Sequence, residues 1–205
     1  MKMGYIKYSL VIGALFVSVS IAPHARAISD PSSLLIQSIQ VGSATDATDE
    51  SIKIVNVGSQ SIDLKGLSIE YKSATGVSWA KKGVVGEGHT LSPGASLVAA
   101  SKQAHDIPLT AGLAQAGGNL RLVFVSKVLD QVAWGTGDSP EGKVFAAPAV
   151  GQILERRCES ACQDTNDNSV DFASSAVAAV TTESEAVAST TSVTAYSIEI
   201  TALLT

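Results

Sequence analysis

The sequence predicts an all-β protein, built as an antiparallel sandwich or barrel. Between Leu34 and Leu154, short runs of apolar residues alternate with polar ones, as expected of strands that bury one face. Glycine and proline separate these runs at short intervals, where turns are expected. The helical period of about 3.6 residues is not evident in any long stretch. Many short strands separated by turns are typical of sandwiches and barrels.

The first 27 residues do not share this pattern. Lys2 and Lys7 precede an apolar run, and Ala25-Arg26-Ala27 has the small-residue pattern of a cleavage site. The apolar run is shorter than the about 20 residues that cross a bilayer as a helix. Residues 1–27 are therefore predicted to be a secretory signal peptide, which places the protein outside the cell or at its surface. An uncleaved membrane anchor is the alternative.

The charge of the chain argues against one class of partner. Loss of residues 1–27 reduces the 14 basic residues to 11, against 19 acidic ones, so the net charge moves from −5 to near −8. An acidic chain repels phosphate backbones, so nucleic acid is not expected as a partner. The basic pairs Lys81-Lys82 and Arg156-Arg157 are interpreted as solvated surface pairs.

The strand pattern repeats in four segments, and in each the apolar residues fall on alternate positions. Alternate side chains of a strand point to the same face of the sheet, so these residues are expected to face the core. In the first segment, a turn at Gly58-Ser59 separates the run with Ile52 and Ile54 from the run with Ile62 and Leu64. The expected inward residues are Ile52, Ile54, Ile62 and Leu64, then Leu67, Ile69 and Tyr71, then Leu120, Leu122 and Phe124, and finally Val132 and Trp134.

The two cysteines, Cys158 and Cys162, are predicted to form a disulfide, because the chain is expected to be exported into an oxidising compartment. Residues four apart in an extended strand are about 13 Å apart, which is too far for a bridge. The segment between them is therefore expected to turn or to form a helical loop. Zinc is the alternative, but a second ligand pair is missing nearby, and His89 and His105 are distant in sequence.

Motifs for enzymatic chemistry are weak. Residues 137–144, "GDSPEGKV", match the start of a phosphate-binding loop, but Val144 stands where a Ser or Thr should hold magnesium. Asp138 and Glu141 would repel phosphate, so we interpret this segment as a turn-rich loop. The G-x-S-x-G motif of hydrolases is absent, and His89 and His105 lie in polar loop contexts. The sequence therefore predicts no catalytic residue, no cofactor and no metal ligand.

One stretch, "CQDTNDNSVDF" at residues 162–172, is rich in the oxygen ligands that calcium prefers. It does not fit an EF-hand, because Ser169 replaces the turn glycine and Ser175 replaces the bidentate glutamate. The simplest interpretation is that its side chains bond to neighbouring backbone amides and fix the loop. A calcium loop of another kind is the alternative. The side chains concerned are Asp164, Asn166, Asp167, Asn168 and Asp171.

Four segments carry further motifs in a fixed order: 50–70, 89–101, 116–135 and 153–172. The first segment has an asparagine before a turn, followed by Asp-Leu and Gly, and the second has a Leu-x-Pro-Gly turn. The third ends in the pattern Asp-x-Val-x-aromatic-Gly. The fourth has an arginine, then a turn rich in Asp and Thr, and then Asp-Phe. The motif residues of the first three are Asn56, Asp63, Leu64 and Gly66; Leu91, Pro93 and Gly94; and Asp130, Val132, Trp134 and Gly135. In this order the segments resemble the lamin-tail domain as found in exported bacterial proteins, over residues 33–172.

The resemblance implies an immunoglobulin-like β-sandwich that binds or tethers, without catalytic residues of its own. Gly66 and Gly94 suit turn positions with positive φ, and Trp134 would supply core area. The expected function is a secreted or cell-surface module for adhesion, tethering or surface assembly, with a protein or surface polymer as the unidentified partner. The alternatives are a calcium-stabilised adhesion domain and an accessory module associated with nuclease or other hydrolase domains.

The composition changes after Phe172. Residues 173–194 are rich in Ser, Thr and Ala and are expected to form a linker. Residues 195–205, "AYSIEITALLT", alternate Ile198 and Ile200 with polar residues, much like the segment 34–43. We expect them to be the first strand of a truncated second lamin-tail domain. A strand that adds to an edge of the first sandwich is the alternative.

Overall fold

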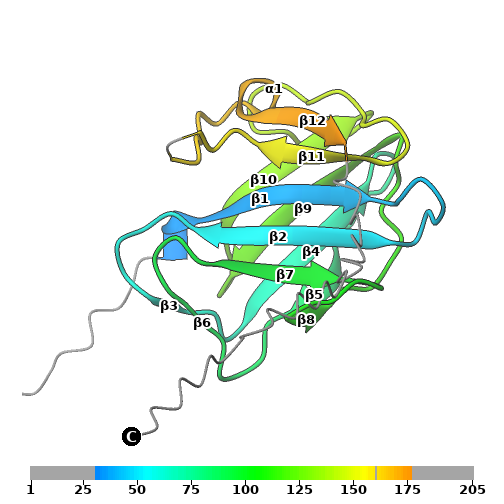
Figure 1. Cartoon of the computed structure of the whole chain (residues 1–205). Coiled ribbons are helices and arrows are strands. Elements are labelled where there is room, and N and C mark those ends of the chain that lie inside the picture. Colours follow the sequence, from blue (N-terminus) through cyan, green and yellow to red (C-terminus); the bar gives the residue numbers. More distant parts are fainter. Residues whose placement is uncertain (1–30, 160, 177–205) are drawn as a thin grey trace, which may run out of the picture.

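The computed structural model describes residues 31–159 and 161–176 (Figure 1). The predicted signal peptide 1–27, most of the predicted linker and the segment 195–205 lie outside these residues. Within the described part, strands dominate, and they are arranged in two main sheets and one two-stranded sheet. A single 3₁₀ turn, η1 (Pro31–Ser33), precedes the first strand of this part.

The larger sheet has six strands in the order β12-β11-β1-β2-β7-β8. Neighbouring strands are antiparallel except for β7 and β8, which pair in parallel. Its strands are β1 (Leu34–Val41), β2 (Glu50–Asn56), β7 (Ser96–Ala100), β8 (Ile107–Pro108), β11 (Gln152–Arg156) and β12 (Phe172–Ala176).

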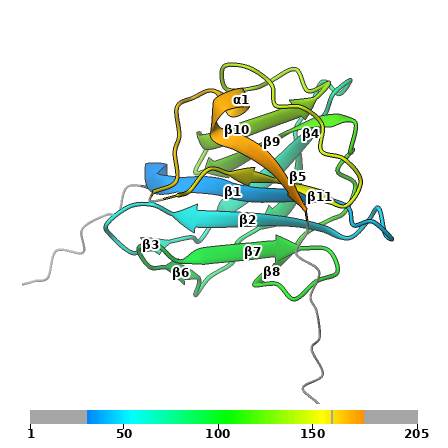
Figure 2. The same ribbon diagram turned by 45° about the horizontal axis from the view of Figure 1, so that its top comes forward.

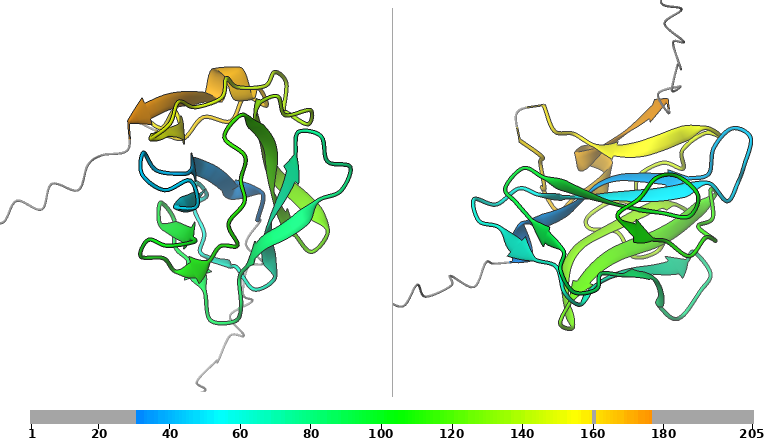
Figure 3. Two further views of the ribbon diagram at one scale, coloured as in Figure 1. Left: turned by 90° about the vertical axis from the view of Figure 1, so that its right-hand side faces the viewer. Right: turned by 60° about the horizontal axis from the view of Figure 1, so that its bottom comes forward.

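The second sheet has four antiparallel strands in the order β10-β9-β4-β5. Its strands are β4 (Leu67–Ser73), β5 (Ala80–Val84), β9 (Gly117–Phe124) and β10 (Lys127–Gly135). The short strands β3 (Ile62–Asp63) and β6 (Thr90–Leu91) pair with each other. Figures 2 and 3 show the two main sheets as facing layers. The predicted all-β, antiparallel sandwich is therefore confirmed.

The core lies between these layers and follows the predicted alternation. Trp134 is fully buried and packs beside Tyr71, with 6.1 Å between the ring centroids. Every residue expected to face the core is buried except Phe124, which is partly buried and packs against the core. Side chains at alternate positions of β2, β4, β9 and β10 meet in this way because the pleat sends them to one face.

One strand of each main sheet, β1 in the six-stranded sheet and β10 in the four-stranded sheet, contains a bulge. In β1 the register shifts between Ile36 and Ser38, and in β10 it shifts between Val128 and Asp130. A bulge turns a side chain and leaves backbone groups without ladder partners. In β1, the amide and the carbonyl of Ile36 bond to side chains of other strands.

The structure differs from the expected pattern in local details. A one-turn helix, α1 (Asn168–Asp171), lies inside the polar stretch 162–172, where no helix was expected. The turn at Gly58-Ser59 leads into β3, which pairs with β6 and not with β2. β12 runs to Ala176, past the domain boundary expected at 172. Among the described residues, no helix has the length and apolar character needed to span a membrane.

Candidate functional site

A buried ion pair connects the two sheets. Asp130 follows the bulge of β10, and Arg156 is the last residue of β11. Arg156 Nη2 donates to both carboxylate oxygens of Asp130, at 2.9 Å and 2.8 Å. Both side chains are 0% exposed. Hydrogen bonds between ionised partners are shorter and stronger than neutral ones, so this pair holds β10 against β11.

The same pair completes the hydrogen bonding of the bulge in β1. The Ile36 amide donates to Asp130 Oδ2 at 2.6 Å, and the Ile36 carbonyl accepts from Arg156 Nε at 2.9 Å. Pairing between β1 and β11 covers only Ser38 to Gln40, beyond the bulge. The side chains of Asp130 and Arg156 therefore replace the ladder hydrogen bonds of Ile36. Leaving these buried backbone groups unpaired would lower the stability of the fold.

Arg156 corrects one sequence-based prediction. We expected Arg156-Arg157 to be a solvated pair, but Arg156 is buried and only Arg157 is exposed. Leu154 and Arg156 occupy alternate positions on β11, so Arg156 shares the inward face with a core leucine. The ring of Phe172 covers the guanidinium, with 4.6 Å between the guanidinium carbon and the ring centroid. In the other basic pair, Lys81 is exposed and Lys82 is half-buried.

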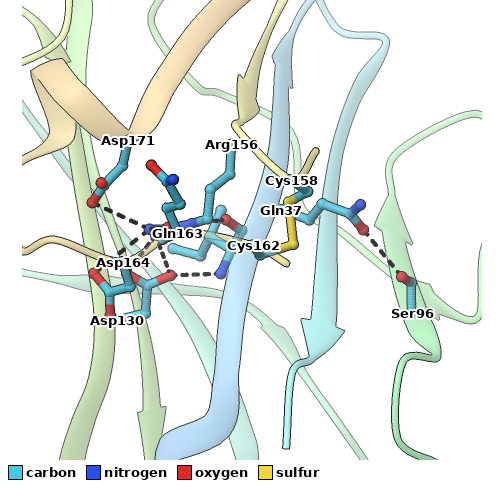
Figure 4. Close-up of a disulfide and its surroundings, with 10 residues drawn as sticks. Gln37, Ser96, Asp130, Arg156, Cys158, Cys162, Gln163, Asp164 and Asp171 are labelled. Atoms are coloured by element: carbon cyan, nitrogen blue, oxygen red, sulfur yellow. Dashed lines mark hydrogen bonds and ion pairs between the residues drawn. A yellow bond between two sulfur atoms is a disulfide. The ribbon is translucent and has the colours of Figure 1, made fainter. Parts of the chain in front are cut away.

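The polar stretch 162–172 wraps around this arginine (Figure 4). The Asp171 carboxylate accepts from the Thr165 amide at 3.0 Å and from Thr165 Oγ1 at 2.7 Å. It also lies 3.4 Å from Arg156 Nη1. Asp167 caps the N-terminus of α1 by accepting from the Ser169 amide at 3.0 Å. The prediction that these side chains bond to nearby backbone amides is therefore confirmed for Asp164, Asp167 and Asp171. Asn168 instead bonds to backbone groups that are distant in the sequence.

Asn168 covers part of the β10 edge of the four-stranded sheet. Its Oδ1 accepts from the Ala133 amide at 2.9 Å, and its Nδ2 donates to the Gln131 carbonyl at 3.0 Å. Its Oδ1 also accepts from the Glu141 amide at 3.2 Å. The side chain is fully buried. One amide thus imitates a neighbouring strand for two residues of β10, which protects that edge from pairing with another chain.

We name Asp130, Arg156, Asn168 and Asp171 the polar clasp, because together they fasten the segment after β11 to both sheets. The disulfide supports this arrangement. Cys158 and Cys162 are bonded with a Cα–Cα distance of 3.9 Å, so the chain between them folds back as expected. The next residue, Gln163, presents its carbonyl to Arg156 Nη1 at 2.9 Å (Figure 4). The bridge therefore directs the loop back onto the buried arginine.

Glu141 lies beside the polar clasp and was not foreseen as part of it. Its Oε2 is buried and has no hydrogen-bond partner among the described residues. Its pKa is raised from 4.5 to about 8, mainly by burial and then by the carboxylates of Asp130 and Asp164. In the sequence, Glu141 belongs to the turn-rich loop 137–144, and nothing near it points to a partner. Only the fold brings it to this cluster.

The cluster has an excess of negative charge. Carboxylate oxygens of Asp130, Glu141 and Asp164 lie within 4.8 Å of one another, a spacing that a cation could bridge. Arg156 already supplies a positive charge there, because its guanidinium contacts Asp130 and lies 3.6 Å from Asp164. Burial raises the pKa of Asp130, and Arg156 and the Ile36 amide oppose this effect. The arrangement is therefore suited to holding the fold with an internal cation.

The remaining predicted positions are spread over the fold. Gly66 and Gly94 have φ angles of 86° and 73°, as expected for their turns. His105 is exposed, with its Nδ1 2.7 Å from the Gln103 carbonyl, and His89 is partly exposed in the loop before β6. The structure does not bring either histidine to the polar clasp.

Comparison with known proteins gives a family match. The family model described as Lamin Tail Domain matches residues 27–176. No match was found among the curated proteins. The matched range contains both sheets, the disulfide and the complete polar clasp.

Proposed function

The chain belongs to the lamin tail domain family, and we propose that it acts as a secreted or cell-surface, non-enzymatic module for adhesion, tethering or surface assembly. In this role the domain contributes a stable surface, and the partner is a protein or polymer at the exterior of the cell. The family and its immunoglobulin-like fold are the premise of the proposal.

One observation supports a binding role more than any other. Three polar side chains of the 153–172 motif are used for internal bonds: Arg156 and Asp171 are fully buried, and Asn168 is hydrogen-bonded to backbone groups. A catalytic group must reach its substrate, so residues engaged in this way are poorly placed for chemistry. What remains for contact with other molecules is the outer surface of the sandwich.

Two features support an exported location. Residues 1–27 have the composition of a signal peptide. The Cys158–Cys162 disulfide would persist in an oxidising compartment and would tend to be reduced in a cytosol. N-terminal sequencing of the protein recovered outside the producing cells should begin at residue 28. An intact N-terminus on membrane-bound material would contradict cleavage.

Binding to cells tests the proposed role directly. Fluorescently labelled full chain is added to washed cells of the producing organism, and bound fluorescence is measured against chain concentration. We expect saturable binding that unlabelled chain competes away. An unrelated acidic β-sandwich protein of similar size is the control. Binding no greater than that of the control would contradict the proposal.

A calcium-stabilised adhesion domain is the second candidate, and one observation favours it. The close approach of Asp130, Glu141 and Asp164 provides three carboxylates to a small volume. The guanidinium of Arg156 in the same volume opposes a second cation. Thermal unfolding with and without calcium separates the two candidates.

A further inference from the structure

The outer face of the four-stranded sheet carries a row of valines. Val84 on β5 is opposite Ser68 on β4, Ser68 is opposite Val123 on β9, and Val123 is opposite Val128 on β10. Directly opposed residues point to the same side of a sheet. Leu67 and Ile69, the neighbours of Ser68, are fully buried in the core, so this row faces away from the core.

Three valines at this end of the sheet are strongly exposed. Val84 is 52% exposed, Val128 is 41% exposed, and Val125, in the turn between β9 and β10, is 78% exposed. Single exposed apolar residues are common, but a row of them on one sheet face is a feature of binding surfaces. We name Val84, Val123, Val125 and Val128 the valine row.

The turn that presents Val125 has an unusual backbone. Phe124 pairs with Lys127, so only Val125 and Ser126 form the turn. Both have positive φ angles, 45° and 71°. Such turns normally use Asn or Gly, and a β-branched residue is strained in this backbone conformation. Valine at this position is unfavourable for the turn itself, so its exposed side chain requires another explanation.

A polar row lies next to the valine row on the same face. Glu70 is opposite Lys81 on one side and Arg121 on the other. Arg121 Nη2 and Nε donate to Glu70 Oε2 at 2.7 Å and 2.9 Å, so these two charges neutralise each other. Lys81 is exposed and forms no ion pair with the described residues. A hollow of about 460 Å³ is lined by residues of both rows.

We propose that the valine row, together with Lys81, binds an extended acidic and apolar polypeptide segment of a partner protein. The inference rests on the proposed function, since it assumes that the domain acts by binding. Apolar side chains of the partner would cover the valines, and a carboxylate would lie in the hollow beside Lys81.

Charge complementarity favours this occupant over a second copy of the chain. A two-fold symmetric dimer places the same patch of each copy against the other. Lys81 would then be covered by a patch whose carboxylate, Glu70, is already paired with Arg121 and is not free to neutralise it. A segment that lies along the strands and carries an apolar and an acidic residue two positions apart meets both rows. Ser68 and Glu70 are also two positions apart, and alternate side chains of an extended chain point to the same face.

Peptide titration tests the proposal with defined probes. The probe is the octapeptide Val-Ser-Glu-Ser-Val-Ser-Glu-Ser, which places valine and glutamate on one face when extended, and the control peptide replaces each glutamate by lysine. Amide shifts of the ¹⁵N-labelled full chain are followed by NMR. We expect shifts on β4, β5, β9 and β10 with the glutamate peptide. The control peptide should bind at least about fivefold more weakly, because Lys81 repels it.

Two variants make the test specific. Val125→Asn fits the turn better than valine, so it should unfold at a higher temperature and yet lower the affinity for the glutamate peptide about fivefold. Lys81→Glu should reverse the preference between the two peptides. Since the asparagine substitution improves the turn, weaker binding by the Val125→Asn variant cannot be ascribed to unfolding.

Several outcomes would overturn the inference. These are an absence of shifts at millimolar peptide, shifts confined to the six-stranded sheet, or unchanged affinity in both variants. Dimerisation without peptide, abolished by Val125→Asn in sedimentation experiments, would identify a second copy as the occupant instead. If both variants bind intact cells as well as the natural sequence does, the proposed function stands and the valine row is not its surface.

Discussion

Asp130 and Arg156 form an ion pair with two hydrogen bonds, 2.8 Å and 2.9 Å long, although neither side chain is exposed to solvent. Removing two charges from water costs several kcal/mol per ion, and a single contact does not offset this. Here the pair also satisfies both backbone groups of Ile36, and Gln163 and Asp171 take the other side of the guanidinium. The burial is tolerated because the buried polar atoms of this pair have partners.

Replacing Arg156 should therefore destabilise the fold strongly. Arg156→Met keeps much of the volume but leaves Asp130 without its cation and the Ile36 carbonyl without a donor. We expect the free energy of unfolding in urea to fall by about 3–5 kcal/mol. Arg157→Met is the matched control: Arg157 is exposed, so a change within about 0.5 kcal/mol is expected. Equal stability of the two variants would contradict this role of Arg156.

Asn168 should contribute more to the stability of the fold than its neighbours in the polar stretch. Asn168→Ala leaves the Ala133 amide and the Gln131 carbonyl without their partner. Urea unfolding should show a loss of about 2–4 kcal/mol, because two backbone groups lose a hydrogen bond. Asn166→Gly serves as the control, since Asn166 is exposed and its φ of 57° suits glycine. If Asn168→Ala is as stable as this control, the edge of β10 does not depend on Asn168.

Glu141 should make the fold less stable as the pH rises. The folded-state pKa is about 8, above the ordinary value of 4.5. Between these two pH values the unfolded chain releases a proton that the folded chain keeps, so the contribution of Glu141 is fully present below about 4.5 and is lost as the pH rises to about 8. Glu141→Gln should remove this fall and give a variant more stable than the natural sequence at about pH 9, above the folded-state pKa.

Urea unfolding across this pH range provides the measurement for Glu141. The exposed Glu159 gives the control variant Glu159→Gln, whose pH profile should follow that of the natural sequence. A Glu141→Gln profile that remains parallel to the natural one would show that Glu141 keeps an ordinary pKa in the folded chain.

The sequence predicted much of the fold because strand alternation is a local property. Ile52, Leu67, Leu120 and Trp134 could each be assigned to the core from their near neighbours alone, and all are fully buried. The disulfide was predictable for a similar reason, since its two cysteines are close in the chain. The pairing of β3 with β6 and the parallel contact of β7 with β8 were not predicted, because strand partners are chosen by packing over long sequence distances.

The candidate site was predicted only in part. The bonds within the polar stretch, such as Thr165 to Asp171, span few residues, and Asp and Asn side chains commonly form such local hydrogen bonds. Arg156 was misplaced because its main partner, Asp130, is 26 residues away and Ile36 is 120 residues away. Glu141 was missed because its raised pKa arises from burial and from carboxylates on other segments. Contacts between residues that are distant in the chain cannot be predicted from the neighbouring sequence alone.

The central claim is that the polar stretch 162–172 is held by the internal cation Arg156 and needs no metal ion. Thermal unfolding of the full chain in excess calcium and in excess chelator tests it most directly, because an ion that binds only the folded state raises the melting temperature. We expect the same melting temperature in both conditions, and the same lack of response for Asp164→Ala. A rise of several degrees with calcium that Asp164→Ala abolishes would contradict the account and identify a calcium site.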